Sequence, residues 1–493
     1  MSMATSRESG PPEVCFGFGI HRSHLLNSRF SAGVTGNSKD LPDAYYSSRN
    51  REQFLGYTKD SLIPLAEVLS QWLDQEMLCT FSVSGTITEL LSRFDPEGLD
   101  MLCELASHRH SELLGETYYR SIAGLFPDLS EFEAQVRLHS RTMEELFGVA
   151  PRVFDNTNIS FNPAMVPVLE NLGFLAVYTE GFDNFFSDMN TDQVYSCNGL
   201  PVFTTNCSLS DDIAFRFFSK DWDRYPLTPA KYASWIAASP GRCVHIFLDS
   251  EIFSRPSHER DALAGFLSGL PEALGQAGVG TCLPSEVASS LPECELPVND
   301  PGLHTLDTPC TLDGMTCILQ HSALLSVMNA GFLKPDASTW RNLQADDHFR
   351  RMEMKSGTCG RSPHFLSNQE VYEYFTTYMR ILSHCEEMAA NRNRHRKAAR
   401  TLRCLPPETA FHFSTEDRLT GFSAYSLDEF AQMLSFTPDR VFAFHQERHD
   451  FGRWIGEVLE DPVLARNVDL CVSRGEAREC VERRLQSLWN RIK

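Results

Sequence analysis

Short apolar segments alternate with amphipathic helical segments along the first 300 residues, and this alternation limits the fold more than any other feature. VCFGFGI at 14–20 has the composition of a buried first strand, and MLCTFSVSG at 77–85 that of a second. Helical apolar spacing marks further segments, several of which lead into another apolar strand: 61–76, 86–94, 97–109, 130–147, 163–172 and 228–239. Repeated strand–helix units of this kind predict an α/β fold with a parallel sheet covered by helices.

Polar residues stand where several of these predicted strands end. His21, Glu116, Asn158 and Asp249 each follow an apolar run directly or within a few residues. In parallel barrels the carboxyl ends of the strands carry the functional side chains. We therefore expect these four residues to gather at one rim of the sheet.

The pattern changes after about residue 300. Long helices are predicted at 319–333 and 367–403, and the basic stretch at 391–403 is expected to be a solvated helix end. Ser426 and Glu429 have capping-box spacing. The predicted organisation has five parts, namely a disordered tail at 1–13, a barrel at 14–300, a helical region completing the site at 301–403, a linker at 404–422 and a small helical module at 423–493.

Bulk composition narrows the classes of partner and compartment. The net charge of 44 − 65 = −21 disfavours nucleic acid and anionic membranes as partners. The 15 cysteines are scattered without a CxxC pair, which favours a reducing compartment. The N-terminal stretch lacks the apolar core of a signal peptide, and no apolar run reaches the ~18 residues of a membrane span. A cytoplasmic location is expected.

Five strings in order resemble glycoside hydrolase family 57, in its archaeal alpha-amylase-like branch. The resemblance covers roughly residues 14–355 and implies an incomplete (β/α)7 barrel that acts on or binds α-glucan or a related saccharide. The strings are IHRS at 20–23, LLGETYYRSIA at 113–123, VFDNTNISFN at 153–162, IFLDSEIF at 246–253 and LQADDHFRRM at 343–352.

The resemblance also implies roles for particular residues. Asp249 matches the general acid/base, and Glu251 shares its face if the chain stays extended, so it could orient Asp249 or a loop. His21 and Glu116 match substrate-binding residues, and Asp347 and His348 keep the core of the last motif. Neither a metal nor another cofactor is implied.

Asn158 is the central departure, because the family's nucleophilic glutamate belongs at that position. An amide cannot replace a carboxylate nucleophile, so retaining hydrolysis is expected to be impaired or lost. Asp155, three residues away, is expected to face the other side of an extended strand. Glu116 could instead activate water with inversion, which needs carboxyl groups roughly 6.5–9.5 Å apart.

Further changes surround the same motifs, and they leave three hypotheses open. Arginines replace the residues usual in the family at positions 22, 120, 350 and 351. The first hypothesis is a saccharide-binding protein with lost hydrolysis, whose ligand is an α-glucan or a modified, anionic oligosaccharide bound by these arginines. The second is an active glycosidase or glucanotransferase that uses Asp249 with another carboxylate. The third is a non-catalytic scaffold that binds a protein partner through 423–493.

Overall fold

The computed structural model divides the chain into two compact units. The first comprises residues 1–23, 49–301 and 359–364, and the second comprises 24–48, 302–358 and 365–493. Each unit is described by itself. The residues that the structure describes are 12–31, 44–156, 161–180, 191–288, 294–296, 318–353, 366–416 and 418–492.

One sheet of the first unit is built on strand β1 (Glu13–Ile20), which starts one residue before the expected strand. It pairs in parallel with β2 (Cys79–Val83) on one side and with β8 (Cys243–Asp249) on the other, and β2 pairs with β3 (Ser111–Leu114). The short strand β9 (Gly280–Thr281) pairs with the beginning of β1. Residues 14–20 of β1 are all buried, on both faces of the strand, as expected for a parallel sheet covered on both sides.

A second sheet continues the barrel. Its parallel strands are β4 (Val153–Asp155), β5 (Ala176–Glu180) and β7 (Leu200–Thr205), and β6 (Val194–Cys197) joins β7 in an antiparallel hairpin, with β10 (Cys294–Glu295) beside β6. A parallel bridge between Gly115 and Phe154 links β3 to β4.

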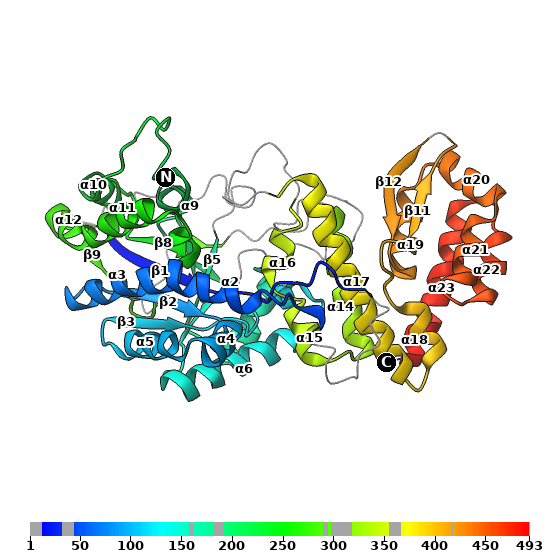
Figure 1. The fold of residues 1–493 in the computed structure, drawn as a ribbon, viewed down its shortest axis with the longest axis horizontal. Coiled ribbons are helices and arrows are strands. Elements are labelled where there is room, and N and C mark those ends of the chain that lie inside the picture. The colour runs from blue at the N-terminus through cyan, green and yellow to red at the C-terminus, as the bar shows by residue number, and fades with distance from the viewer. Residues whose placement is uncertain are drawn as a thin grey trace, which may run out of the picture. The chain divides into compact units, whose positions relative to one another are not determined.

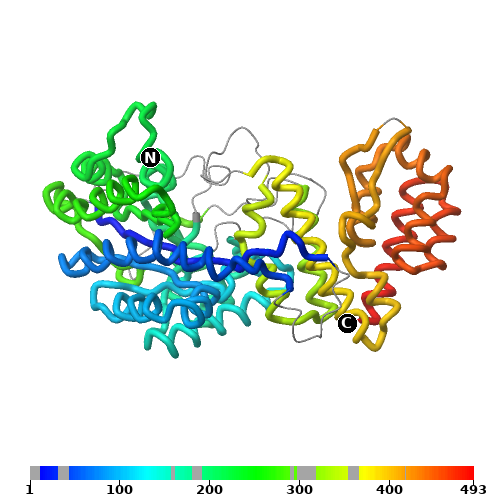
Figure 2. Tube along the Cα trace, viewed as in Figure 1, coloured from blue at the N-terminus to red at the C-terminus, as the bar shows by residue number. Residues whose placement is uncertain are grey.

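The two sheets together give the order β8-β1-β2-β3-β4-β5-β7 for the parallel strands. Between β7 and β8 the described residues form no ladder, although the Asn206 N–H donates to the His245 carbonyl at 2.7 Å. This confirms the expected incomplete (β/α)7 barrel, and the course of the chain from β1 to β8 can be followed in Figure 2.

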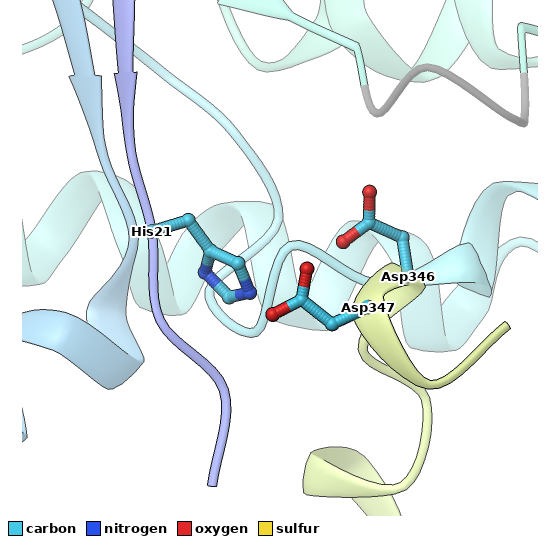
Figure 3. Close-up of side chains that lie close together, drawn as sticks. All are labelled: His21, Asp346 and Asp347. Carbon is cyan, nitrogen blue, oxygen red and sulfur yellow. The ribbon is translucent and has the colours of Figure 1, made fainter. Parts of the chain in front are cut away.

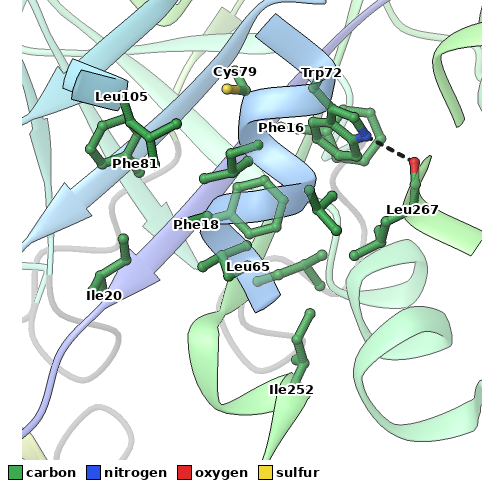
Figure 4. Packing of buried hydrophobic residues seen from close by; sticks show 14 of the residues in the cluster. Phe16, Phe18, Ile20, Leu65, Trp72, Cys79, Phe81, Leu105, Ile252 and Leu267 are labelled. Atoms are coloured by element: carbon green, nitrogen blue, oxygen red, sulfur yellow. Dashed lines mark hydrogen bonds between the residues drawn. The ribbon is translucent and has the colours of Figure 1, made fainter. Parts of the chain in front are cut away.

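Helices cover these strands (Figure 1), and the predicted ones agree closely with those observed. They are α2 (Asn50–Tyr57), α3 (Ile63–Asp74), α4 (Gly85–Phe94), α5 (Pro96–Ser107), α6 (Ser130–Phe147), α7 (Val166–Asn171), α9 (Cys207–Asp211), α10 (Pro229–Ala237), α11 (Ser257–Ser268), α12 (Leu270–Ala277) and α13 (Pro284–Val287). Trp72 of α3 packs edge-on against Phe16 and Phe18 of β1, and its indole N–H donates to the Leu267 carbonyl at 2.8 Å (Figure 4). A buried tryptophan with its N–H satisfied fixes α3 against the sheet.

The second unit is mainly helical. Its helices before residue 403 are α14 (Ile318–Leu333), α15 (Ala337–Asn342), α16 (Asp346–Arg350), α17 (Asn368–Arg392) and α18 (Arg396–Leu402). The helix expected to run from 367 to 403 is therefore broken around Asn393, where the backbone turns extended.

The segment 404–422 is not the linker that the sequence suggested. It contains strand β11 (Phe411–Ser414) and most of β12 (Leu419–Ala424), which form an antiparallel hairpin. Leu405, Phe411 and Phe413 are buried in a core shared with the helices that follow. Aromatic residues at alternate positions of a strand bury one face of the hairpin, so Pro406 and Pro407 mark a turn rather than a flexible connection.

Helices α19 (Leu427–Phe436), α20 (Asp439–Glu447), α21 (Asp450–Glu457), α22 (Pro462–Asp469) and α23 (Arg474–Ile492) complete the second unit. Ser426 caps α19 as predicted, because its hydroxyl accepts from the Glu429 N–H at 3.1 Å. Among the helices described in either unit, none combines the length and the apolar character needed to cross a bilayer.

Candidate active site

The expected site residues of the first unit stand at the carboxyl ends of its strands. His21 follows β1, Glu116 lies two residues beyond β3, Asp155 closes β4 and Asp249 closes β8. The β1–β8 register pairs Gly19 with Asp249, so the acid lies beside the end of β1. Asn158 falls within 157–160, outside the described residues.

His21 is held by a residue that the sequence did not single out. Its Nδ1 hydrogen-bonds the Ser84 hydroxyl at 2.7 Å, and the imidazole is buried at the end of β1 (Figure 3). Ser84 directly follows β2 and caps α4, whose Ile87 N–H it accepts at 3.4 Å. The neighbouring strand and its helix cap thus fix the orientation of the imidazole.

Asp249 is exposed, and the chain turns directly after it. Residues 250–253 form a 3₁₀ turn whose first free N–H, that of Glu251, donates to the Asp249 carboxylate at 2.8 Å. The extended course that would place Glu251 on the face of Asp249 is therefore not adopted. The Glu251 main chain hydrogen-bonds Asp249, whereas its side chain forms an ion pair with Arg22.

Arg22 is also supported by an aromatic residue. Its guanidinium lies 5.5 Å from the centre of the Tyr57 ring, and the Tyr57 hydroxyl hydrogen-bonds Ser250 at 2.7 Å. Arg22, Glu251 and Tyr57 thus form a connected wall beside Asp249.

Glu116, Arg120 and Asp155 form a buried acidic–basic cluster. Arg120 Nη1 lies 3.5 Å from Glu116 Oε2 and 3.7 Å from Asp155 Oδ2. The Ser82 hydroxyl of β2 donates to Asp155 at 2.8 Å. The side chains of Glu116 and Asp155 are both buried, so their charges depend on this guanidinium and on hydrogen bonds.

His139 of α6 is a further buried residue in contact with the rim that sequence reasoning missed. Its Nε2 lies 2.9 Å from the Val83 carbonyl, and its Nδ1 accepts from the Glu116 N–H at 3.3 Å, so the ring is neutral with the proton on Nε2. Burial lowers the pKa of His139 to about 4. The only available signal was a histidine on the apolar face of a predicted helix.

The last motif lies in the second unit, on α16. Asp346 and Asp347 begin this helix (Figure 3). His348 is buried, its Nε2 donating to the Asn342 carbonyl at 3.1 Å and its Nδ1 accepting from the Tyr374 hydroxyl at 2.6 Å. Both ring nitrogens of His348 are therefore used in hydrogen bonds within the second unit.

The two arginines that follow are engaged within the same unit. Arg350 Nε lies 3.2 Å from Asp346, and the Arg351 guanidinium lies 5.8 Å from the centre of the Tyr374 ring.

The barrel rim can bind and orient a polar ligand. Asp249 offers an exposed carboxyl group that can exchange a proton with a ligand. The imidazole of His21, which follows the neighbouring strand β1, is held in a fixed orientation by Ser84. Three further carboxylates near these strand ends, those of Glu116, Asp155 and Glu251, each contact a guanidinium.

Comparison with known proteins gives consistent matches. The profile of glycosyl hydrolase family 57 matches residues 37–299. A Methanocaldococcus jannaschii protein named "Putative alpha-amylase" is 32% identical over 261 residues, which cover 52% of this chain and 55% of the relative. The match thus spans about half the length of that protein.

Two solved structures share the fold. A 4-alpha-glucanotransferase from Thermococcus litoralis superposes with a TM-score of 0.53 at 16% identity, covering 76% of this chain and 60% of that one. A branching enzyme of the family 57 type from Pyrococcus horikoshii gives a TM-score of 0.50 at 14% identity, covering 77% and 91%.

Proposed function

Since the chain belongs to glycosyl hydrolase family 57, whose profile matches residues 37–299 of its 493, we propose that its barrel binds α-glucan and has lost ordinary retaining hydrolysis. The relatives are named as an α-amylase, a glucanotransferase and a branching enzyme, all of which point to α-glucan as the ligand class. Asp249 remains the acid/base residue, and Asn158 replaces the nucleophile.

The observation that carries this proposal is the unequal pair of Asp249 and Asn158. Asp249 stands exposed at the end of β8, where an acid/base residue can reach a ligand. Its expected partner position holds an amide in the sequence. Retaining glycosidases need two carboxyl groups about 5–5.5 Å apart, and loss of a nucleophile costs several orders of magnitude in rate.

Three other carboxylates near the strand ends are poor substitutes for the missing nucleophile. Glu116 and Asp155 are buried, and both contact Arg120. A guanidinium beside a carboxylate lowers its basicity and its nucleophilicity. Glu251 is bound to Arg22. These contacts favour binding over the alternative of an active glycosidase that uses a non-standard carboxylate.

The ligand is a neutral rather than an anionic saccharide. The arginines at positions 22, 120 and 350 each contact a carboxylate of their own unit, and Arg351 lies over Tyr374. Guanidinium groups that already bind carboxylates have little left to offer a sugar acid. An α-glucan has no charge to satisfy and is compatible with this arrangement.

Restoring the carboxylate tests the proposal. The parent chain and Asn158→Glu are compared for maltoheptaose binding by calorimetry and for release of reducing ends. We expect the parent to bind without measurable turnover, and Asn158→Glu to gain hydrolysis by at least about 100-fold, since a nucleophile contributes several orders of magnitude.

Two matched variants serve as controls. Asn158→Gln has the size of the glutamate without its charge and should stay inactive, and Asp249→Asn should abolish the activity gained by Asn158→Glu. Turnover by the parent at ordinary enzymatic rates of about 1–1,000 per second would contradict the loss of hydrolysis. Absence of maltoheptaose binding to the parent would contradict the ligand class.

A further inference from the structure

A single buried guanidinium links two carboxylates at the barrel rim. Arg120 is only 4% exposed, and its Nη1 lies 3.5 Å from Glu116 and 3.7 Å from Asp155. A buried arginine is stable only with such partners, and each buried acid in turn needs the cation. The cluster therefore behaves as one unit, in which moving any member disturbs the other two.

The backbone at Arg120 adopts a left-handed conformation, with φ of 47°. Non-glycine residues rarely adopt it, and they do so where surrounding contacts hold them. The Arg120 N–H donates to the Thr117 carbonyl at 2.8 Å, and the Thr117 hydroxyl accepts from the Ser121 N–H at 2.6 Å. These two bonds close a tight turn directly after Glu116 and fix the origin of the arginine side chain.

Strand β1 leaves space for the guanidinium. A Cβ at Gly19 would lie 3.3 Å from Arg120 Nη1 and 3.8 Å from Nη2. Gly19 is paired in register with Asp249 and lies two residues before His21. The guanidinium thus reaches from the loop after β3 to the level of Asp249, and it contacts the same carboxylate, Asp155, that Ser82 of β2 binds.

We propose that Arg120 is a positioning residue that holds Glu116 ionised and fixed as a hydrogen-bond acceptor, and that this sets the glucan affinity of the rim. The proposal rests on the proposed function. Without the guanidinium, Glu116 and Asp155 would be two buried carboxylates that have lost their shared cation. Burial and like charge both favour uptake of a proton by such a pair. A protonated Glu116 would donate a hydrogen bond where the ionised one accepts.

The choice of variants follows from the charged and titratable groups around Glu116. Among the residues that the structure describes, these groups include Arg120 on its own loop, Asp155 on β4 and the neutral His139 on α6. Arg120→Met removes the cation, whereas Arg120→Lys keeps the charge but loses the planar fork that can contact two acids at once. Arg120→Met combined with Asp155→Asn removes one charge of each sign, so the net buried charge is that of the parent.

Two measurements test the inference, namely maltoheptaose affinity by calorimetry and the infrared band of protonated carboxyl groups. We expect at least a 10-fold loss of affinity in Arg120→Met and in the charge-matched double variant, with partial recovery in Arg120→Lys. The parent already contains protonated carboxyl groups at Glu386 and Glu429, so the test is a difference spectrum. An additional band should appear in Arg120→Met relative to the parent and disappear when Glu116→Gln is added. A merely structural arginine would change stability without producing this band.

The outcomes separate the inference from the proposed function. A folded double variant that binds maltoheptaose as tightly as the parent would overturn the positioning role. An Arg120→Met spectrum without the band would overturn the claim that Arg120 keeps Glu116 ionised, and Arg120→Lys serves for affinity if Arg120→Met does not fold. If the parent binds no glucan, the proposed function fails, and with it the claim about affinity, whereas the infrared arm still tests the ionised state.

Discussion

At the scale of single residues, His139 shows how one neutral imidazole can fix the geometry of a barrel rim. It receives the Glu116 N–H and approaches the Val83 carbonyl, so it ties the ends of β2 and β3 together from the helix outside. The side chain is fully buried, and protonation of Nδ1 would replace an acceptor by a donor facing another donor. Burial therefore keeps the ring neutral over most of the pH range.

His139→Gln should flatten the pH dependence of stability on the acid side. The pKa of His139 falls from 6.5 in the unfolded chain to about 4 in the folded one. Between these values only the unfolded state takes up the proton, so the free energy of unfolding decreases as pH falls from 6.5 towards 4. From pH 7 to pH 5 the loss from this residue is about 2 kcal/mol.

Glutamine can donate and accept as His139 does but cannot titrate, so urea unfolding of this variant should show about 2 kcal/mol less loss between pH 7 and pH 5. His258→Gln, at an exposed position, is the matched control and should leave the slope unchanged. Equal slopes for the parent and His139→Gln would show that this ring does not govern acid stability.

The sequence located His21, Glu116 and Asp249 at strand ends because that rule needs only the local order of apolar and polar residues. It could not find Ser84 or His139, whose partners lie 63 and 23 positions away and meet only in the folded barrel. Glu251 was misplaced because its direction depends on a tight turn after Asp249, a choice between two local conformations that periodicity does not decide.

At the scale of elements, buried acids join the helices of the second unit. Glu386 of α17 accepts from the Cys404 N–H, and Glu429 of α19 accepts from the Tyr425 N–H at 2.7 Å and from the Ser322 hydroxyl of α14. Burial raises the pKa of Glu386 to about 8 and that of Glu429 to about 7. Both junctions are therefore most stable with protonated carboxyl groups.

Glu386→Gln should stabilise the second unit at alkaline pH. With a folded pKa of about 8 against 4.5 unfolded, Glu386 holds a proton in the folded state that the unfolded chain has released. The stability that this gives is complete below pH 4.5 and is lost as pH rises towards 8. Thermal unfolding should show the advantage of Glu386→Gln over the parent growing by about 2 kcal/mol from pH 6 to pH 8.

Glutamine still accepts from the Cys404 N–H, so the fold is retained. Glu373→Gln, at an exposed position of the same helix, is the control and should follow the parent. A constant difference between Glu386→Gln and the parent over this pH range would mean that Glu386 is ionised in the folded protein.

The elements themselves were predictable where hydrophobic periodicity was strong, as in α4 and α6, whose bounds agree with the sequence within one residue. The β6–β7 hairpin was missed although Asn198-Gly199, with φ of 51° and 94°, is a strong turn signal for a two-residue hairpin. The sequence predicts a linker in place of the hairpin β11–β12, because Pro406-Pro407 outweighs the alternating aromatic residues at 411 and 413.

At the scale of the second unit as a whole, helix α18 and the hairpin β11–β12 share one core with the helices after residue 423. Phe411 and Phe413 pack against Phe430 of α19, at 5.6 and 6.0 Å between ring centres. Phe332 of α14 meets Trp489 of α23 at 5.4 Å, and the Trp454 indole N–H donates to the Thr409 carbonyl at 2.9 Å. Residues 423–493 are thus no independent appendage.

A chain ended after residue 422 should consequently lose the second unit's stability rather than only a partner-binding module. Truncation would expose the buried side chains of Phe411 and Phe413 together, and loss of large aromatic core contacts costs about 3–5 kcal/mol each. We expect the shortened chain to bind a hydrophobic dye strongly and to lose the thermal transition of the second unit. A soluble shortened chain with an unchanged transition would contradict the shared core.

A surface variant is the sharper way to test whether residues 423–493 bind a protein partner. Leu470 and Val472 are 79% and 84% exposed, so Leu470→Ser with Val472→Ser changes the apolar surface without removing core contacts. Surface substitutions of this kind change stability by about 0.5 kcal/mol or less. We expect the double variant to keep the thermal midpoint of the parent. In cross-linking experiments it should lose any partner that docks on this surface. A lowered midpoint would instead show that both side chains support the fold.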